Sequence, residues 1–181
     1  MVSLKKIMLV CLIVAVVLFA STLGIFFYSF KTKYNDVAKV YASEFGVDVS
    51  LVMAVIKAES KFDKNALSSA NAVGLMQVKL QTANYMLQKL GESEISQQQL
   101  FDPQTNIKLG TKYLQYLLAK FQNVEVSICA YNAGETIVSN WLKDSNLSND
   151  GKTLFKIPFA ETSNYLKKVL FNKNVYDVLL R

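Results

Sequence analysis

The carboxylate that the sequence places best for chemistry is Glu59. Val52, Val55 and Ile56 follow one another at spacings of three and one, and they form the apolar face of a predicted helix over residues 49–60. Glu59 falls on the same face, at the C-terminal end of that helix. Burial and the negative end of the helix dipole both disfavour the ionised form, so we expect a raised pKa for Glu59. A carboxyl group that stays protonated near neutral pH can act as the general acid in glycosidic bond cleavage.

The spacing of these residues leaves one alternative open. Glu59 could turn outward where the helix ends and pair with Lys57 or Lys61. In that case it would be an ordinary surface carboxylate, and the helix would carry no chemistry.

The sequence contains no histidine, which narrows the possible chemistry. Ser-His-Asp and Cys-His nucleophile systems are excluded, as are histidine metal sites, so any chemistry must come from carboxylates, tyrosines, lysines or hydroxyls. The two cysteines, Cys11 and Cys129, fall in different parts of the chain, and no disulfide is expected. Cys129 lies in an apolar stretch and is predicted to be a small core residue.

Residues 7–30 contain no charged side chain. As a helix they would extend about 36 Å at about 1.5 Å per residue, enough to cross a bilayer core of about 30 Å. We therefore expect a short tail and an uncleaved transmembrane anchor over residues 1–30, followed by one folded domain over residues 31–181. A cleavable signal peptide is the alternative, but the apolar run is long and lacks a good small-residue cleavage site. A lipoprotein modified at Cys11 is disfavoured by the bulky Val10.

The orientation of this anchor is weakly marked by charge. Lys5 and Lys6 precede the segment, and Lys31 and Lys33 follow it, so the positive-inside rule hardly discriminates. The very short N-terminal tail makes a cytoplasmic N-terminus the expected topology.

The formal net charge is +6 for the chain and +4 for residues 31–181, which suits an anionic polymer or surface. There is no basic run with interleaved aromatic residues, so no nucleic-acid partner is expected.

Beyond the anchor the apolar periodicity is helical nearly throughout, and no stretch shows sustained strand alternation. Asp48 is a good N-cap, and Asp102-Pro103 is a clear helix start. The polar residues 144–152 are predicted to form a mobile surface loop. The domain is predicted to be mainly α, with helices over residues 34–45, 49–60, 82–90, 102–121, 125–133, up to about 141, and 161–171.

Three short motifs occur in an informative order. They are Glu59-Ser60, Gly74-Leu75-Met76-Gln77 and Ala130-Tyr131-Asn132-Ala133-Gly134. Together they resemble the signature motifs of the Slt-type lytic transglycosylases. The resemblance extends from about residue 34 to 171 and includes Phe45-Gly46-Val47-Asp48, Asp102-Pro103 with Asn106-Ile107 and Gly110, and Glu161-Thr162 with Tyr165. The chain departs from the family at Lys79-Leu80, where Met-Pro is frequent, at Asn71, where glycine is common, and at Glu135, where proline is usual.

The resemblance implies a lysozyme-like helical domain split by a long cleft, and it implies roles for particular residues. Glu59 corresponds to the sole catalytic acid and base. Four residues correspond to substrate-contacting or cleft-lining positions: Ser68, Met76, Gln77 and Tyr131. Glu161 resembles a polar cleft or supporting residue, Asn132 is expected to brace its helix, and Tyr165 belongs to the late motif that supports the site.

The implied reaction is cleavage of peptidoglycan between N-acetylmuramic acid and N-acetylglucosamine without water. The muramic acid C6 hydroxyl attacks C1 and leaves a 1,6-anhydro end, and this reaction needs neither a metal nor an organic cofactor. The substrate lies outside the cytoplasmic membrane, so the domain should face outward. Three alternatives stay open: a hydrolytic lysozyme on the same fold, a non-catalytic peptidoglycan-binding module, and a structural membrane protein.

Overall fold

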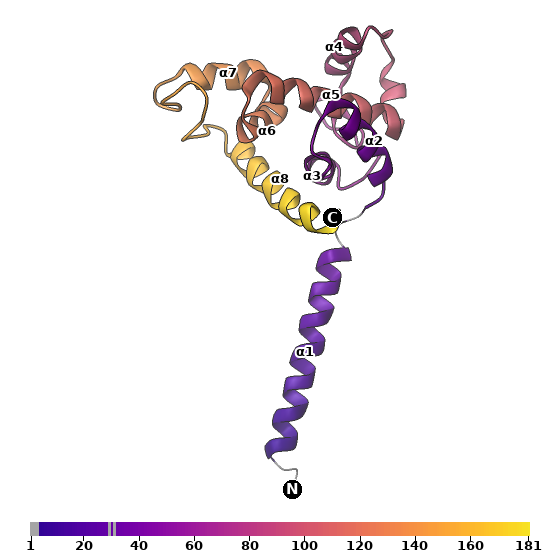
Figure 1. The fold of residues 1–181 in the computed structure, drawn as a ribbon, viewed down its shortest axis with the longest axis vertical. Coiled ribbons are helices and arrows are strands. Elements are labelled where there is room, and N and C mark those ends of the chain that lie inside the picture. The colour runs from indigo at the N-terminus through magenta and orange to yellow at the C-terminus, as the bar shows by residue number, and fades with distance from the viewer. Residues whose placement is uncertain (1–3, 29, 31) are drawn as a thin grey trace. The chain divides into compact units, whose positions relative to one another are not determined.

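The structure is a computed structural model that describes residues 4–28, 30 and 32–181, and it divides into two compact units, residues 1–32 and 33–181. Residues 4–28 of the first unit form one helix, α1 (Leu4–Tyr28) (Figure 1). Its segment Lys6–Phe26 is 21 residues long, has a mean hydropathy of 2.8, and is not buried. By length and composition it is therefore able to cross a bilayer.

The described part of the second unit is almost entirely helical, which confirms the prediction of a mainly α domain (Figure 1). A two-stranded antiparallel hairpin accompanies the helices. In chain order the elements are α2 (Asn35–Phe45), α3 (Val49–Glu59), β1 (Ala72–Val73), β2 (Val78–Lys79), α4 (Leu80–Leu90), a 3-10 helix (Gln97–Phe101), α5 (Pro103–Phe121), α6 (Val124–Ala133), α7 (Glu135–Lys143) and α8 (Ala160–Leu179).

Capping residues set the ends of the helices that position the site. Asp48 caps α3 and Asp102 caps α5, each accepting a hydrogen bond from a backbone N–H of the first turn, at 2.9 and 2.8 Å. Pro103 is the first residue of α5, where its missing N–H costs nothing. Gly46 ends α2 in the left-handed conformation, with φ 66°. The start of α3 that fixes the position of Glu59 is therefore encoded locally.

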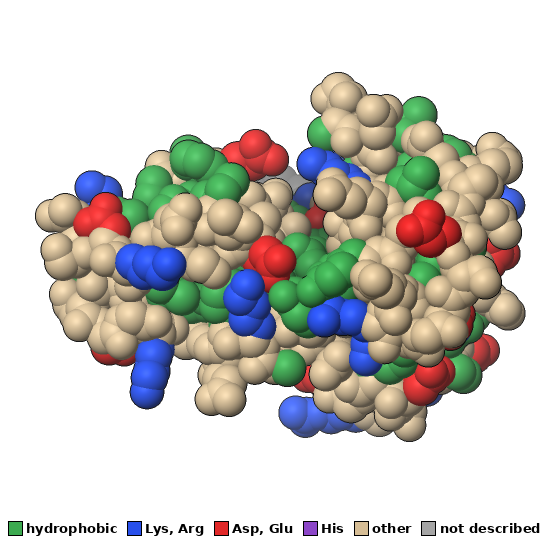
Figure 2. All heavy atoms as spheres, turned by 90° about the horizontal axis from the view of Figure 1, so that it is seen from above, with side chains coloured by type: hydrophobic (Ala, Val, Ile, Leu, Met, Phe, Trp, Pro, Cys, Tyr) green, Lys and Arg blue, Asp and Glu red, His purple; other side chains and the backbone are tan. Residues whose placement is uncertain are grey.

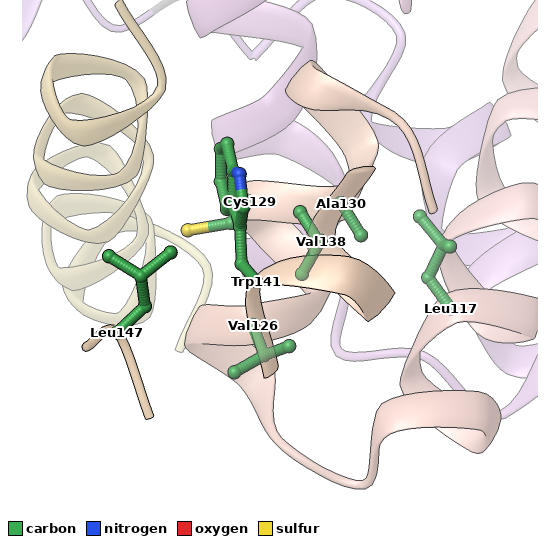
Figure 3. Packing of buried hydrophobic residues seen from close by; sticks show 7 residues of the cluster. All are labelled: Leu117, Val126, Cys129, Ala130, Val138, Trp141 and Leu147. Atoms are coloured by element: carbon green, nitrogen blue, oxygen red, sulfur yellow. The ribbon is translucent and has the colours of Figure 1, made fainter. Parts of the chain in front are cut away.

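Helix α5 packs against α2, α4 and α6, and it carries much of the core. Ile107, Leu114 and Leu117 are fully buried, whereas Leu118 and Phe121 remain partly exposed. Beside α5, helices α6 and α7 and the segment after α7 enclose the apolar cluster shown in Figure 3. Its members are Leu117, Val126, Cys129, Ala130, Val138, Trp141 and Leu147.

Cys129 is one of the buried residues of this cluster, which confirms its predicted role in the core. Burial raises the pKa of its thiol to about 11. The side chain therefore behaves as a small apolar group and not as a nucleophile.

Asn106, near the start of α5, holds the hairpin in place from inside the core. Its side-chain amide donates to the backbone carbonyls of Val73 and Leu100 at 2.8 and 2.9 Å, and its oxygen accepts from the Met76 N–H at 2.8 Å. Gly74 has φ 74°, and a Cβ there would lie 2.5 Å from the Asn106 amide nitrogen. Glycine is therefore required at this point for both its conformation and its size.

Helix α8 packs along α3 and is longer than predicted. The sequence prediction ended this helix at residue 171, but Asn172 and Tyr176 are buried in its continuation. Asn172 donates to the Ala54 carbonyl at 3.4 Å, and Lys173 lies 2.7 Å from the Asp48 carboxylate. These tertiary contacts with α3 extend a helix whose last turns lack a clear apolar period.

The segment 144–152 is a mostly exposed loop, as predicted, but two of its residues are tied to the core. Leu147 and Ser148 are buried, and the Asp150 carboxylate accepts hydrogen bonds from two backbone N–H groups at 2.7 and 2.8 Å. These bonds hold the pKa of Asp150 at about 2. The segment is polar in composition but is tied to the core by one leucine and one organised turn.

Candidate active site

Glu59 is the last residue of α3, and it lines a cleft of about 560 Å³. Segments that lie far apart in the sequence line this cleft. They are residues 68–70, 72 and 77–79, Thr82 of α4, Tyr113 of α5, the end of α6, and Glu161 at the start of α8. The fold thus brings the three sequence motifs to one place around Glu59.

Burial is the main influence on the Glu59 carboxyl group, and it raises the pKa to about 7. A hydrogen bond from Tyr165 and the positive charge of Lys168 act in the opposite direction, and the charge of Glu161 adds to the increase. The expected direction of the shift is confirmed. The alternative in which Glu59 turns outward to pair with Lys57 or Lys61 is wrong, since its partner is the Tyr165 hydroxyl.

Tyr165 and Lys168 hold the end of α3 from one face of α8. The Tyr165 hydroxyl donates to Glu59 Oε1 at 2.6 Å, and the Lys168 ammonium donates to the carbonyl of Ala58 at 2.5 Å. Tyr165 is therefore in direct contact with the acid. Sequence reasoning missed Lys168, although a residue three positions after Tyr165 lies on the same helix face.

Tyr131 of α6 lies close enough to Glu59 that the carboxylate charge, after burial, contributes to raising the pKa of the phenol. Its hydroxyl donates to the carbonyl of Met76 at 2.9 Å, and not to Glu59. Its ring packs on Tyr113 with 5.4 Å between centroids. Tyr131 therefore fixes the segment after Gly74 next to the acid.

The resemblance implied that Met76 lines the cleft, and the structure differs. Its side chain is fully buried and does not line the cleft. Gly110 of α5 makes the room: a Cβ there would lie 2.5 Å from the Met76 sulfur. Gln77, in contrast, lines the cleft in a left-handed conformation with φ 48°, and its amide donates to the carbonyls of Ala66 and Gly74 at 3.2 and 3.0 Å.

The remaining residues named from the sequence also lie at the cleft. Ser68 lines it and accepts from the Ala72 N–H at 3.0 Å, so its hydroxyl also closes the loop. Asn132 accepts from the Thr162 hydroxyl at 2.7 Å, a contact that joins α6 to α8 in agreement with the expected brace. Glu161 lines the cleft and is exposed.

Two further residues complete the surroundings of Glu59. The Ser60 hydroxyl donates to the Leu75 carbonyl at 2.8 Å and ties the end of α3 to the hairpin loop. Tyr113 lines the cleft beside Tyr131, and burial raises its pKa to about 12. Sequence reasoning did not single out Tyr113, and only the tertiary structure shows that it reaches the cleft.

A carboxyl group with a pKa near 7 can both give and take a proton at neutral pH, so this arrangement suits acid–base chemistry at one residue. Within residues 4–28, 30 and 32–181, no three His, Cys, Asp or Glu side chains gather where they could hold a metal ion. Figure 2 shows one face of the molecule, on which Lys and Arg side chains are scattered among acidic ones and do not form a stripe.

Comparison with known proteins gives a consistent result. The family model for the transglycosylase SLT domain matches residues 36–154. A soluble lytic murein transglycosylase of Escherichia coli is 38% identical over 155 residues, which cover 84% of this chain and 23% of that protein. A membrane-bound lytic murein transglycosylase E of Buchnera aphidicola is 35% identical over 94 residues, covering 51% of this chain and 42% of that protein.

Solved structures show the same relationship. The 70 kDa soluble lytic transglycosylase of Escherichia coli superposes with a TM-score of 0.75 and 35% identity, covering 83% of this chain and 25% of that one. The chain therefore spans about a quarter of the length of the soluble relatives it matches. The expected lysozyme-like helical fold is confirmed.

Proposed function

This chain belongs to the family of transglycosylase SLT domains, and from that premise we propose that it is a peptidoglycan lytic transglycosylase whose proton donor is Glu59. The observation that carries the proposal is the state of the Glu59 carboxyl group. It lies in a cleft large enough for sugar rings, burial raises its pKa to about 7, and Tyr165 holds it at 2.6 Å. A protonated, oriented carboxyl group at neutral pH is what cleavage of a glycosidic bond needs.

In the proposed reaction Glu59 gives its proton to the oxygen between N-acetylmuramic acid and N-acetylglucosamine. The 2-acetamido carbonyl of the muramic acid stabilises the positive charge that develops at C1. Glu59, now a carboxylate, takes the proton of the C6 hydroxyl as that oxygen bonds to C1. The bond to the leaving sugar is replaced by the internal ether, no water is consumed, and Glu59 ends protonated again.

We further propose that residues 1–30 anchor the protein in the cytoplasmic membrane and that residues 31–181 form the catalytic domain on the outer side. The apolar segment Lys6–Phe26 supports an anchor, and membrane-bound relatives are consistent with it. The outward orientation follows from the proposed substrate. Insertion can be tested by extraction of membranes with carbonate, and orientation by protease digestion of intact spheroplasts.

The closest alternative is hydrolysis by a lysozyme-type mechanism, which commonly uses a second carboxylate. Glu161 favours it, because this residue lines the same cleft and its charge acts on Glu59. The test is a digest of purified peptidoglycan with the detergent-solubilised full chain, followed by mass analysis. Products lighter by one water than the hydrolytic ones support the proposal, and reducing ends establish hydrolysis. Binding without release of fragments establishes a non-catalytic module.

The pKa of Glu59 sets the expected pH dependence. The general acid must be protonated, so kcat/KM should be nearly constant below about pH 6 and fall about tenfold per unit well above pH 7. Initial rates on soluble glycan strands between pH 5 and 9 measure this dependence. On the alkaline limb kcat/KM should fall by about one decade per pH unit. A profile that stays flat through about pH 9 would contradict Glu59 as the acid.

Tyr165→Phe tests the hydrogen bond to the acid. That bond favours the carboxylate, so its loss should raise the pKa of Glu59 and move the alkaline limb of kcat/KM to higher pH. Looser positioning should also lower kcat by about ten- to a hundredfold. Tyr41→Phe, on α2 and outside the cleft, is the matched control and should leave the profile unchanged. A lower rate with an unmoved limb would show that Tyr165 acts by packing alone.

A further inference from the structure

Lys79 brings a positive charge into the cleft that holds Glu59. It is the second residue of β2, it directly precedes α4, and its side chain is exposed. Of the described residues that line this cleft, Lys79 is the one lysine or arginine, whereas Glu59 and Glu161 are carboxylic acids. An anionic group of a ligand in this cleft would therefore be attracted to Lys79 and repelled by Glu161.

The Lys79 ammonium has no structural task within residues 4–28, 30 and 32–181. Lys108, Lys120 and Lys173 each form an ion pair with a carboxylate, and Lys168 donates to a backbone carbonyl. Lys79 makes neither kind of contact in that part of the chain. Lys168, and not Lys79, is the cation that acts on the Glu59 carboxyl group. Lys79 is thus available to a ligand and is not the counterion of the acid.

The start of α4 strengthens the positive potential around Lys79. No side chain caps this helix, and its first turn contains no acidic residue. Thr82, in that first turn, lines the same cleft. The helix N-terminus adds a modest partial positive charge to that of the ammonium group, although Lys79 is the feature that can reach a ligand.

The substrate of the proposed reaction carries carboxylates at regular positions. Each muramic acid has a lactyl ether at C3 that ends in a free carboxylate on a bare strand. On a peptide-bearing strand that carboxyl group is an amide, and the stem peptide supplies carboxylates of its own. We infer that Lys79 is a specificity residue that binds a carboxylate of muramic acid or its stem peptide and so sets the register of the strand against Glu59. The inference rests on the proposed function.

The test compares Lys79→Met and Lys79→Arg in the detergent-solubilised full chain. Methionine has a similar length without charge, and arginine keeps the charge. Lys156→Met is the matched control, because Lys156 is exposed and outside the cleft. The substrates are peptide-bearing strands, bare strands made from them by amidase treatment, and both kinds with carboxylates blocked as methyl amides. KM and kcat are measured on each, and equilibrium binding of labelled strands is measured in the Glu59→Gln background.

We expect Lys79→Met to raise KM by about two- to fivefold with little change in kcat, and to weaken binding by the same factor. Lys79→Arg and Lys156→Met should behave like the unaltered chain. On blocked strands the difference between Lys79→Met and the unaltered chain should vanish. A penalty confined to bare strands identifies the lactyl carboxylate, and one confined to peptide-bearing strands identifies the stem. Both results support the inference.

Two results would overturn it: an unchanged KM and binding constant for Lys79→Met on every strand, or an equal penalty on strands with blocked carboxylates. Failure of the proposed function looks different. In that case the unaltered chain would release no anhydro products, while the binding measurement in the Glu59→Gln background would still decide whether Lys79 recognises a carboxylate.

Discussion

Glu59→Gln should lower the release of anhydro products from purified peptidoglycan by about a thousandfold or more, because glutamine can neither give nor take the proton. Its amide oxygen still accepts the Tyr165 hydroxyl, so the fold should be kept. Glu44→Gln, an exposed change on α2 outside the cleft, is the matched control and should be fully active. Activity of Glu59→Gln above about a tenth of the original would rule out the proposed acid.

Glu161→Gln distinguishes the single-acid mechanism from the two-carboxylate mechanism. Under a single-acid mechanism it removes only a charge that raises the pKa of Glu59, so the rate should fall by less than about tenfold and the alkaline limb should move to lower pH. Under a two-carboxylate mechanism it should be as damaging as Glu59→Gln.

The same Glu59→Gln variant should be more stable than the original chain above neutral pH. The pKa of Glu59 is about 7 in the folded state against 4.5 as the ordinary value, so the folded protein binds this proton more tightly. The resulting stability is fully present below pH 4.5 and is lost as the pH rises through 7. At pH 8 glutamine avoids a cost of up to about 3 kcal/mol, and near pH 4.5 the two proteins should be nearly equal.

The second large effect is expected at Asn106. Asn106→Leu keeps much of the volume but leaves the Met76 N–H and the carbonyls of Val73 and Leu100 without their partners. Each unpaired buried group costs about 1–3 kcal/mol, so we expect a loss of about 3 kcal/mol or more in the free energy of unfolding. Urea titration followed by the fluorescence of the single tryptophan, Trp141, measures it.

The matched control for Asn106 is Asn172→Leu on α8. Asn172 is also buried, but its amide makes a single long hydrogen bond of 3.4 Å, so its replacement should cost about 1 kcal/mol. Equal losses for the two variants would show that Asn106 contributes only volume. The Met76 carbonyl also accepts a hydrogen bond from the Tyr131 hydroxyl beside Glu59. Loss of the Asn106 contacts should therefore disturb this segment and lower kcat at temperatures where the protein is still folded.

Helix α3, which carries the proposed acid Glu59, could be predicted from the sequence because its signals are local. Asp48 caps α3, the apolar residues repeat at helical spacing, and Glu59 follows on the same face. The raised pKa of Glu59 could be predicted in direction for the same reason. Its partner could not, because Tyr165 stands 106 positions later and meets Glu59 only when α8 packs on α3.

The error at Met76 and the burial of two residues in the loop 144–152, which was not predicted, have a common physical cause. Methionine is apolar, and whether it lines a cleft or fills a core depends on the space that a distant glycine, Gly110, leaves for it. The segment 144–152 is polar in composition, yet one leucine at 147 reaches the apolar cluster and fixes it. In both cases the deciding contact is remote in sequence, and periodicity within one element contains no information about it.

The two α8 contacts that hold the end of α3 can form only after nearly all of the described domain has been synthesised. Tyr165 and Lys168 lie C-terminal to every other element of the cleft, and α8 is the last helix described. A ribosome-bound chain that has exposed α2 to α7 already possesses Glu59 but has neither its hydroxyl partner nor the packing that raises its pKa. The orientation of the Glu59 carboxyl group therefore depends on the helix that is made last among those the structure describes.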